Sequence, residues 1–185
     1  MTSQRRLLTL TEIAIMAAIG VLLSTYVKIQ GFWPQGGSIS LVMLPIALLS
    51  FRRGWVAGVI CGLLVGLINL MVEPFVVHPV QVVLDYPLAF AALGLSGVFA
   101  PNRDIPRGKQ VTRAILGLIL AGGLRLLSHF ISGVIWFGQY APKGMNVAMY
   151  SFLYNVSYIL PDVIIAAVLM TILITQAPQL VMKQR

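Results

Sequence analysis

The stretch His129–Asn155 reads HFISGVIWFGQYAPKGMNVAMYSFLYN and joins the end of one long apolar segment to the start of the next. It holds one His, one Trp, three Tyr, three Phe and two Asn. Two helices that faced only lipid would need none of the polar side chains, which are costly in hydrocarbon. The stretch therefore predicts two neighbouring membrane helices with a binding site between them.

The composition is that of a chain whose main solvent is lipid. Of its 185 residues, 58% are hydrophobic and 10% are charged, whereas a soluble domain carries roughly 25% charged residues. The net charge of +8 comes from basic residues in short gaps between apolar runs, which argues against a nucleic-acid partner. We expect an all-α, multi-pass protein of the prokaryotic plasma membrane, in contact with the lipid bilayer.

Two further features narrow the class of protein. Cys61 is the single cysteine and lies in an apolar run, which argues against a disulfide framework and a cysteine metal cluster. The apolar run from Leu7 to Val27 follows Arg5 and Arg6, as in a signal peptide. It is too long for that role and lacks a clear cleavage site followed by a soluble domain. We interpret it as a first, retained span.

Six apolar segments are expected to cross or enter the membrane, at about 7–28, 39–51, 54–72, 79–99, 111–137 and 147–176. The second is too short to span upright, and Gly36 and Gly37 before it predict an irregular, re-entrant backbone. Such backbone is tolerated at membrane depth only against protein or a water-filled cavity. We therefore expect a cavity near residues 30–40, within one transmembrane domain over residues 1–185.

The basic residues predict the orientation of the chain. Ten of them fall on one side of the six expected spans: Arg5, Arg6, Arg52, Arg53, Arg103, Arg107, Lys109, Arg113, Lys183 and Arg185. The other side has only Lys28 and Lys143, and Arg125 lies within the fifth span. By the positive-inside rule, both termini are expected to be cytoplasmic.

Small residues recur at helical spacing in two spans. Ala14 and Ala18 form one such pair, and Gly58, Gly62 and Gly66 form a ladder. Small residues let helix backbones approach closely in lipid. Packing inside the bundle and contact with a partner protein are equally compatible with either set.

Ionisable residues inside spans are costly, so each is a candidate functional residue. The spans hold Asp85, Arg125, His129 and Asp162, with Glu12 and Glu73 near segment ends. With a helical rise of about 1.5 Å, Asp85 lies roughly 9 Å and His129 roughly 12 Å below the outer ends of their spans. Tyr150 and Asn155 lie roughly 5–12 Å down the last span. Four polar side chains from three helices are therefore expected at one level.

Helical phase gathers the same residues on common faces. Ser132, Gly133, Trp136 and Phe137 follow His129 at spacings of three, four, seven and eight, so they share its face. Of these, Gly133, Trp136 and Phe137 are expected to contact the ligand together with His129.

Helical phase also groups polar residues in two other expected spans. His78 and Gln81 precede Asp85 at spacings of seven and four, with Tyr86 beside it, and Tyr154 follows Tyr150 by four. Trp33, in the GFWPQGG loop, is expected to fold over the top of the site as a lid.

A carboxylate among aromatic rings in a dry pocket favours a flat cation, which supplies opposite charge, stacking and cation–π attraction. A neutral or anionic ligand would leave Asp85 unpaired. We expect a small aromatic cation as the ligand. Arg125 and Asp162 differ by only a few residues in depth, nearer the middle of the membrane, so we expect them to form a structural salt bridge. The competing Arg125–Asp85 pair would weaken this argument.

The sequence lacks the motifs of several kinds of enzyme and metal site. There is no G-x-x-x-x-G-K-[ST] sequence, so the chain is not expected to hydrolyse ATP. No His/Glu metal motif and no nucleophile elbow occur, so neither a metal site nor a catalytic nucleophile is expected. We expect a binding protein without a cofactor. An acid–base enzyme that uses Asp85 and His129 stays an alternative.

Three long motifs resemble a known family. GGSISLVMLPIALLSFRRG, HPVQVVLDYPLAFAALGLSGVF and HFISGVIWFGQYAPKGMN…YSFLYN are similar to the thiamine-specific substrate-binding (S) component of energy-coupling factor (ECF) transporters. The resemblance implies a six-transmembrane-helix S-component bundle that binds thiamine near the extracellular face. It also implies a transmembrane T component and two cytoplasmic ATPases, which use ATP, as partners. An S component for another vitamin, such as riboflavin, is the second alternative.

The resemblance also implies roles for single residues. Ala14 and Ala18 match the motif that docks on the T component. The positions implied for ligand binding are Trp33, Asp85, Tyr86, His129, Tyr150 and Asn155.

Two positions depart from the family pattern. Phe137 stands where a stacking Trp is common, with Trp136 one residue before it, so either ring could stack on the ligand. Phe75 stands where a Tyr can help to hold the ligand.

Overall fold

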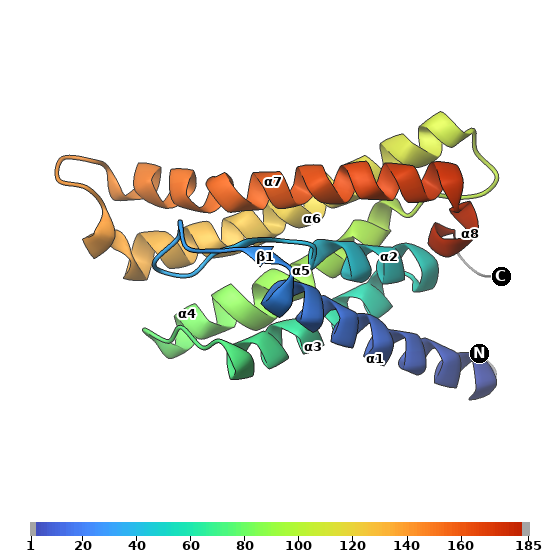
Figure 1. The fold of residues 1–185 in the computed structure, drawn as a ribbon, viewed down its shortest axis with the longest axis horizontal. Helices are drawn as coiled ribbons and strands as arrows, with labels where there is room; N and C mark the ends of the chain where they lie inside the picture. The colour runs from blue at the N-terminus through green and yellow to red at the C-terminus, as the bar shows by residue number, and fades with distance from the viewer. Residues whose placement is uncertain (1–2, 183–185) are drawn as a thin grey trace.

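Five long apolar helical segments make up most of the protein. The computed structural model describes residues 3–182. Within them, five helical segments are long and apolar enough to cross a membrane: α1 (Ser3–Tyr26), α3 (Trp55–Val72), the broken segment Pro79–Phe99, α6 (Arg107–Trp136) and α7 (Val147–Gln176). They lie side by side along one long axis (Figure 1). The expectation of an all-α, multi-pass membrane protein is confirmed.

The segment between α1 and α3 re-enters the bundle. β1 (Lys28–Ile29) pairs with β2 (Ile39–Ser40) in a short antiparallel hairpin, and α2 (Met43–Arg53) follows. With 11 residues, α2 is roughly 16 Å long, which is too short to cross a bilayer. Most of its side chains, such as that of Met43, are nevertheless buried. The irregular re-entry expected from Gly36 and Gly37 is therefore present, while a count of six spans stays a prediction.

The third long segment, Pro79–Phe99, is not a regular helix. It consists of α4 (Pro79–Val83), a π-helical turn η1 (Leu84–Leu88), α5 (Ala89–Leu93) and a 3₁₀ stretch η2 (Gly94–Phe99). Pro87 has no N–H to donate within the helix, and the N–H of Ala89 reaches back to the carbonyl of Leu84. Such π turns are frequent at functional sites. This one carries Asp85 and Tyr86.

The glycine ladder of α3 packs inside the bundle. Gly58, Gly62 and Gly66 are buried, and a Cβ on Gly62 would overlap the carbonyl of Phe90. The question left open by the spacing is settled for these residues, because their contacts are internal. Ala14 and Ala18 differ, since they lie on the exposed face of α1.

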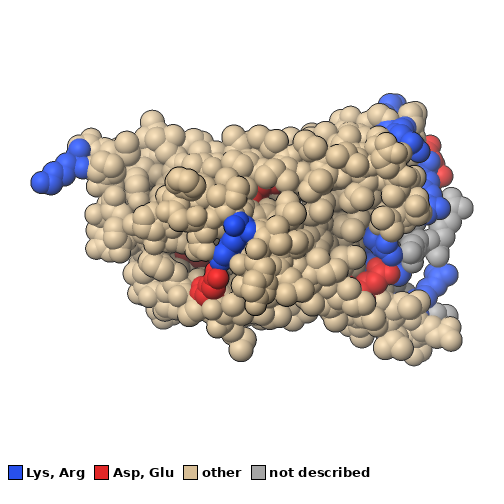
Figure 2. Space-filling model, in the orientation of Figure 1, with Lys and Arg blue, Asp and Glu red and all other residues tan. Residues whose placement is uncertain are grey.

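Basic residues gather at the end of the molecule where the two termini lie (Figures 1 and 2). Arg52 and Arg53 both bind the Glu12 carboxylate there, at 3.1 and 2.6 Å. The hydrogen bond from Arg53 to Glu12 raises the pKa of the guanidinium above its usual value. Lys183 and Arg185 lie outside the described residues. That this end faces the cytoplasm, and that residues 1–185 form one domain, stay predictions.

Two more short helices lie among the described residues. η3 (Gly138–Tyr140) lies in the turn between α6 and α7, and α8 (Pro178–Val181) follows α7.

Candidate ligand-binding site

A cavity of about 380 Å³ opens at the end of the bundle opposite the termini. It is lined by the ends of α1 and α3, the loop around the β1–β2 hairpin, the segment Pro79–Phe99, and the facing halves of α6 and α7. Gln30, residues 33–38 and Ser40 form part of its wall, so the cavity expected near residues 30–40 is present. Its volume lies in the range of small-molecule sites.

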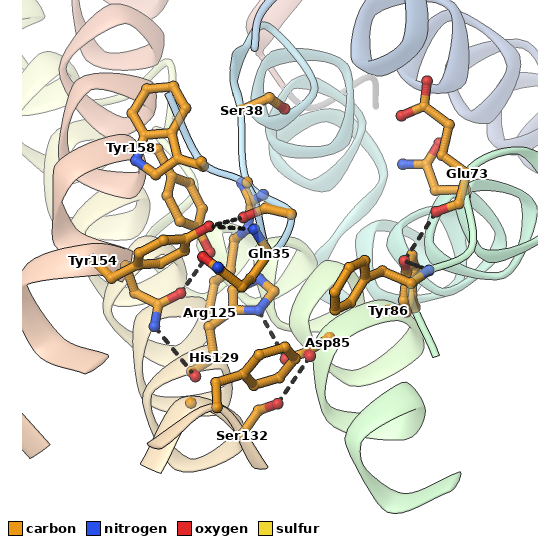
Figure 3. Close-up of a pocket in the computed structure, with 18 of the residues that line it drawn as sticks. Gln35, Ser38, Glu73, Asp85, Tyr86, Arg125, His129, Ser132, Tyr154 and Tyr158 are labelled. Atoms are coloured by element: carbon orange, nitrogen blue, oxygen red, sulfur yellow. Dashed lines mark hydrogen bonds and ion pairs between the residues drawn. The ribbon is translucent and has the colours of Figure 1, made fainter. Parts of the chain in front are cut away.

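Asp85 is the centre of a hydrogen-bond network in this cavity (Figure 3). One carboxylate oxygen lies 3.0 Å from Nδ1 of His129. The other accepts hydrogen bonds from Oγ of Ser132 at 2.8 Å and from Nε2 of Gln81 at 2.7 Å. Within residues 3–182, no Lys or Arg forms an ion pair with Asp85. The carboxylate is held by side chains that carry no permanent positive charge.

His129 has one nitrogen bound and one free. With the proton on Nδ1, which donates to Asp85, its Nε2 is an acceptor. That Nε2 atom is buried and has no hydrogen-bond partner. A ligand donor could therefore bind there. The ring lies edge-on to that of Tyr158, with centroids 6.1 Å apart.

The end of α6 decides which aromatic ring faces the cavity. Phe137 lines it and stacks on Phe75, with ring centroids 5.8 Å apart. Trp136 does not line it, and its indole stacks on His78 at 5.2 Å. Because α6 ends at Trp136, the backbone of Phe137 leaves the helical path and its ring turns inward. Phe137, and not Trp136, therefore lines the cavity, and which of the two rings stacks on the ligand stays a prediction.

The loop before α2 forms the roof of the cavity. Nε1 of Trp33 donates to Oγ of Ser157 at 2.7 Å, and the indole lies edge-on to Tyr158. The hydroxyl of Tyr154 donates to the carbonyl of Gly36 at 2.7 Å and accepts from the N–H of Gln35. Trp33 thus lies where a lid was expected, and the loop is attached to α7.

Two tightly placed glycines make this arrangement possible. Gly37 has a φ of 119°, in the left-handed region, and a Cβ there would press on Tyr158. Gly133 lies so close to Ser151 that a side chain at position 133 would displace the side chain of Ser151.

Arg125 and Asp162 form the structural ion pair that the sequence predicts. Nη1 of Arg125 lies 3.0 Å from Oδ2 of Asp162, and both side chains are buried. The other oxygen of Asp162 accepts the N–H of Ser40 at 2.7 Å. The pair therefore fixes the end of β2 between α6 and α7, and the competing Arg125–Asp85 pair does not form.

The remaining site residues lie around this centre. The hydroxyl of Tyr86 accepts the N–H of Phe75 at 2.8 Å and donates to the carbonyl of Glu73. Asn155 donates to the carbonyl of His129 and accepts from the hydroxyl of Tyr158 at 2.6 Å. Of the nine expected site residues, the structure places eight on the cavity wall: Trp33, Asp85, Tyr86, His129, Gly133, Phe137, Tyr150 and Asn155.

Sequence reasoning missed several lining residues. Tyr158 follows Tyr154 by four, so its helical phase was a usable signal. Gln35 lies in an irregular loop and carried no such signal. Lys28 and Glu73 also line the cavity. No cluster of three or more His, Cys, Asp or Glu that could hold a metal occurs in the described part of the chain.

Comparison with known proteins gives concordant matches over nearly the whole chain. The family model described as thiamine transporter protein matches residues 10–182. The chain is 41% identical to the thiamine transporter ThiT of Bacillus subtilis (strain 168) over 186 residues, 97% of each protein. It is 34% identical to ThiT of Lacticaseibacillus paracasei, covering 97% of this chain and 93% of that protein.

A solved structure of ThiT from Listeria monocytogenes has the same fold. The TM-score is 0.86 at 30% identity, over 96% of this chain and 99% of that one.

Proposed function

The chain belongs to the family of thiamine transporter proteins, and on this premise we propose that it captures thiamine in the cavity around Asp85. One observation carries the proposal. A carboxylate with no Lys or Arg partner among residues 3–182 lies between aromatic rings, in a cavity of small-molecule size. The relatives are named as transporters, in agreement with the expectation that the chain is not an enzyme.

Thiamine matches the chemistry of this cavity. It joins a flat aminopyrimidine to a thiazolium ring with a permanent positive charge. Asp85 supplies the opposite charge, and the rings of Phe137 and Tyr150 supply stacking and cation–π attraction. The free Nε2 of His129 supplies an acceptor for an amino group. A neutral ligand would forgo the charge pairing.

We further propose that the protein is the S component of an ECF-type importer. It takes thiamine from the extracellular side, and a T component with two ATPases drives uptake. The chain has no phosphate-binding loop of its own, so the ATP would be used by the ATPases and the chain would need no cofactor. The exposed faces of Ala14 and Ala18 are available for contact with the T component.

The central test is thiamine binding by the purified protein. We expect saturable binding by calorimetry and quenching of tryptophan fluorescence. Asp85→Asn should weaken thiamine binding roughly 10- to 100-fold, because a charge-assisted contact is lost. Asp104→Asn, on an exposed loop, is the matched control and should bind as the wild type does. No binding of thiamine, or equal binding by Asp85→Asn, would contradict the proposal.

The partnership predicts that binding and uptake can be separated. Ala14→Trp with Ala18→Trp should abolish thiamine uptake by cells while leaving thiamine binding within about threefold, because bulk on that face blocks close helix approach. Leu116→Trp, on the exposed face of α6, should leave both intact. Normal uptake by the Ala14/Ala18 variant would rule out this docking surface.

A further inference from the structure

Two permanent cations line the cavity, and each is bound by a carboxylate. Lys28 forms an ion pair with Glu73 at the mouth. Arg125 forms one with Asp162 at a deeper level. Among the described lining residues, Lys28 and Arg125 are the only Lys or Arg. The cavity therefore contains Asp85 as a carboxylate free of a Lys or Arg partner, and no cation that is free of a carboxylate.

From this arrangement we propose that Glu73 is a specificity-determining residue: by binding Lys28, it makes the site discriminate against phosphate esters of its ligand. The inference rests on the proposed function and deepens it. The hydroxyethyl arm of thiamine is the position that carries phosphate in its esters. The two described lining cations that a phosphate on this arm could pair with, Lys28 and Arg125, are each already bound by a carboxylate.

A hydrogen bond to the π turn holds the backbone of Glu73 in place. The carbonyl of Glu73 accepts the hydroxyl of Tyr86, the residue beside Asp85 on the π turn. Lys28 is the first residue of β1, and its side chain is only 11% exposed. That side chain therefore lies in the cavity wall beside Glu73 and is largely shielded from solvent.

A phosphate group would find this site unfavourable. It carries a charge of about −1.5 to −2 at neutral pH, and it would have to lose water close to the carboxylates of Glu73 and Asp85. Like charges brought together without a free counter-ion are a common means of rejecting a competing ligand. The alcohol of free thiamine carries no such penalty.

Arg125 cannot take the place of Lys28. Its partner Asp162 has a side chain with no exposure, and that carboxylate also holds the N–H of Ser40. Moving Arg125 to a phosphate would leave a buried carboxylate unpaired, which is strongly destabilising. The mouth pair, whose Glu73 side chain is 50% exposed, is the one whose removal the protein can tolerate.

The experiment compares affinity for thiamine monophosphate with affinity for thiamine, both measured by calorimetry. In Glu73→Gln, Lys28 is released, and the affinity ratio should shift toward the phosphate ester by roughly tenfold. In the double variant Lys28→Gln/Glu73→Gln, the ratio should return to the wild-type value. Glu73→Asp, which keeps the carboxylate, should also show the wild-type ratio. A general loosening of the loop would weaken the binding of both ligands and leave the ratio of their affinities unchanged.

The outcomes separate this inference from the proposed function. If wild type fails to bind thiamine, the proposed function fails and this inference fails with it. If thiamine binds but Glu73→Gln leaves the ratio unchanged, only the role of Glu73 is overturned. A raised ratio that persists in the double variant would equally overturn it, because the effect would not pass through Lys28.

Discussion

At the residue scale, the carboxylate of Asp85 is already oriented in the absence of a cationic ligand. Gln81, four residues earlier on the same segment, and His129 and Ser132 on α6 hold its two oxygens. These donors fix the orientation of the carboxylate without neutralising it by a Lys or Arg. Because little reorganisation is then needed on binding, the full charge interaction is available to the ligand.

Trp33 should report occupancy of the cavity. Of the three Trp, it alone lines the cavity, whereas Trp55 is half-exposed at the start of α3. Trp33→Phe should therefore remove most of the fluorescence quenching by thiamine and weaken binding by roughly two- to fivefold. Trp55→Phe is the control and should keep both. Full quenching in Trp33→Phe would show that the indole does not contact the ligand.

At the element scale, the contact between α3 and the segment Pro79–Phe99 positions the acidic wall of the site. Gly66, Gly62 and Gly58 lie against the backbone at Tyr86, Phe90 and Gly94 in turn. The absence of side chains lets the irregular segment pack directly on α3. The π turn with Asp85 is supported by backbone contact, and its position depends on this glycine face.

Enlarging the middle glycine should disturb both stability and binding. Gly62→Val places side-chain atoms where the carbonyl of Phe90 lies, and overpacking of this kind costs about 1–3 kcal/mol. We expect a lower melting temperature in detergent, and weaker thiamine binding because η1 shifts. Gly123→Val is the control, because a Cβ at Gly123 meets open space. Equal melting temperatures would contradict the role of the ladder.

At the scale of the whole molecule, the basic residues gather at one end and the cavity lies at the other. The basic end carries the Arg52–Glu12–Arg53 cluster and the bond from Arg107 to the carbonyl of Thr175. The cavity lies at the other end, roofed by the loop around the hairpin. The positive-inside rule predicts that the basic end faces the cytoplasm, and the cavity would then open to the outside, as the proposed capture of thiamine requires.

Cysteine labelling tests this orientation directly. Cys61 is the single native cysteine and is buried, so an introduced thiol will dominate the signal. Lys143→Cys, on the exposed turn before α7, should react with a membrane-impermeant maleimide added to intact cells. Arg103→Cys, on the exposed loop before α6, should react only after permeabilisation. The reverse pattern would invert the topology.

Much of the fold could be predicted from local sequence. The last span was expected at 147–176 and is α7, Val147–Gln176. Burial of apolar runs and the cost of charge in lipid are properties of single segments, so hydropathy and depth counting find them. The same depth argument predicted the Arg125–Asp162 pair and the meeting of Asp85 with His129.

Other features depend on contacts between segments. Whether Trp136 or Phe137 faces the cavity is decided by where α6 ends, and a shift of one residue turns a side chain by about 100°. The ion pair of Lys28 with Glu73 joins residues 45 apart, one in β1 and one at the end of α3, and no periodicity encodes such a contact. Hydropathy and helical spacing were therefore enough to place the spans and most of the cavity wall. Only the tertiary structure decided which ring lines the cavity and which cations are neutralised, because both depend on how helix ends and loops pack.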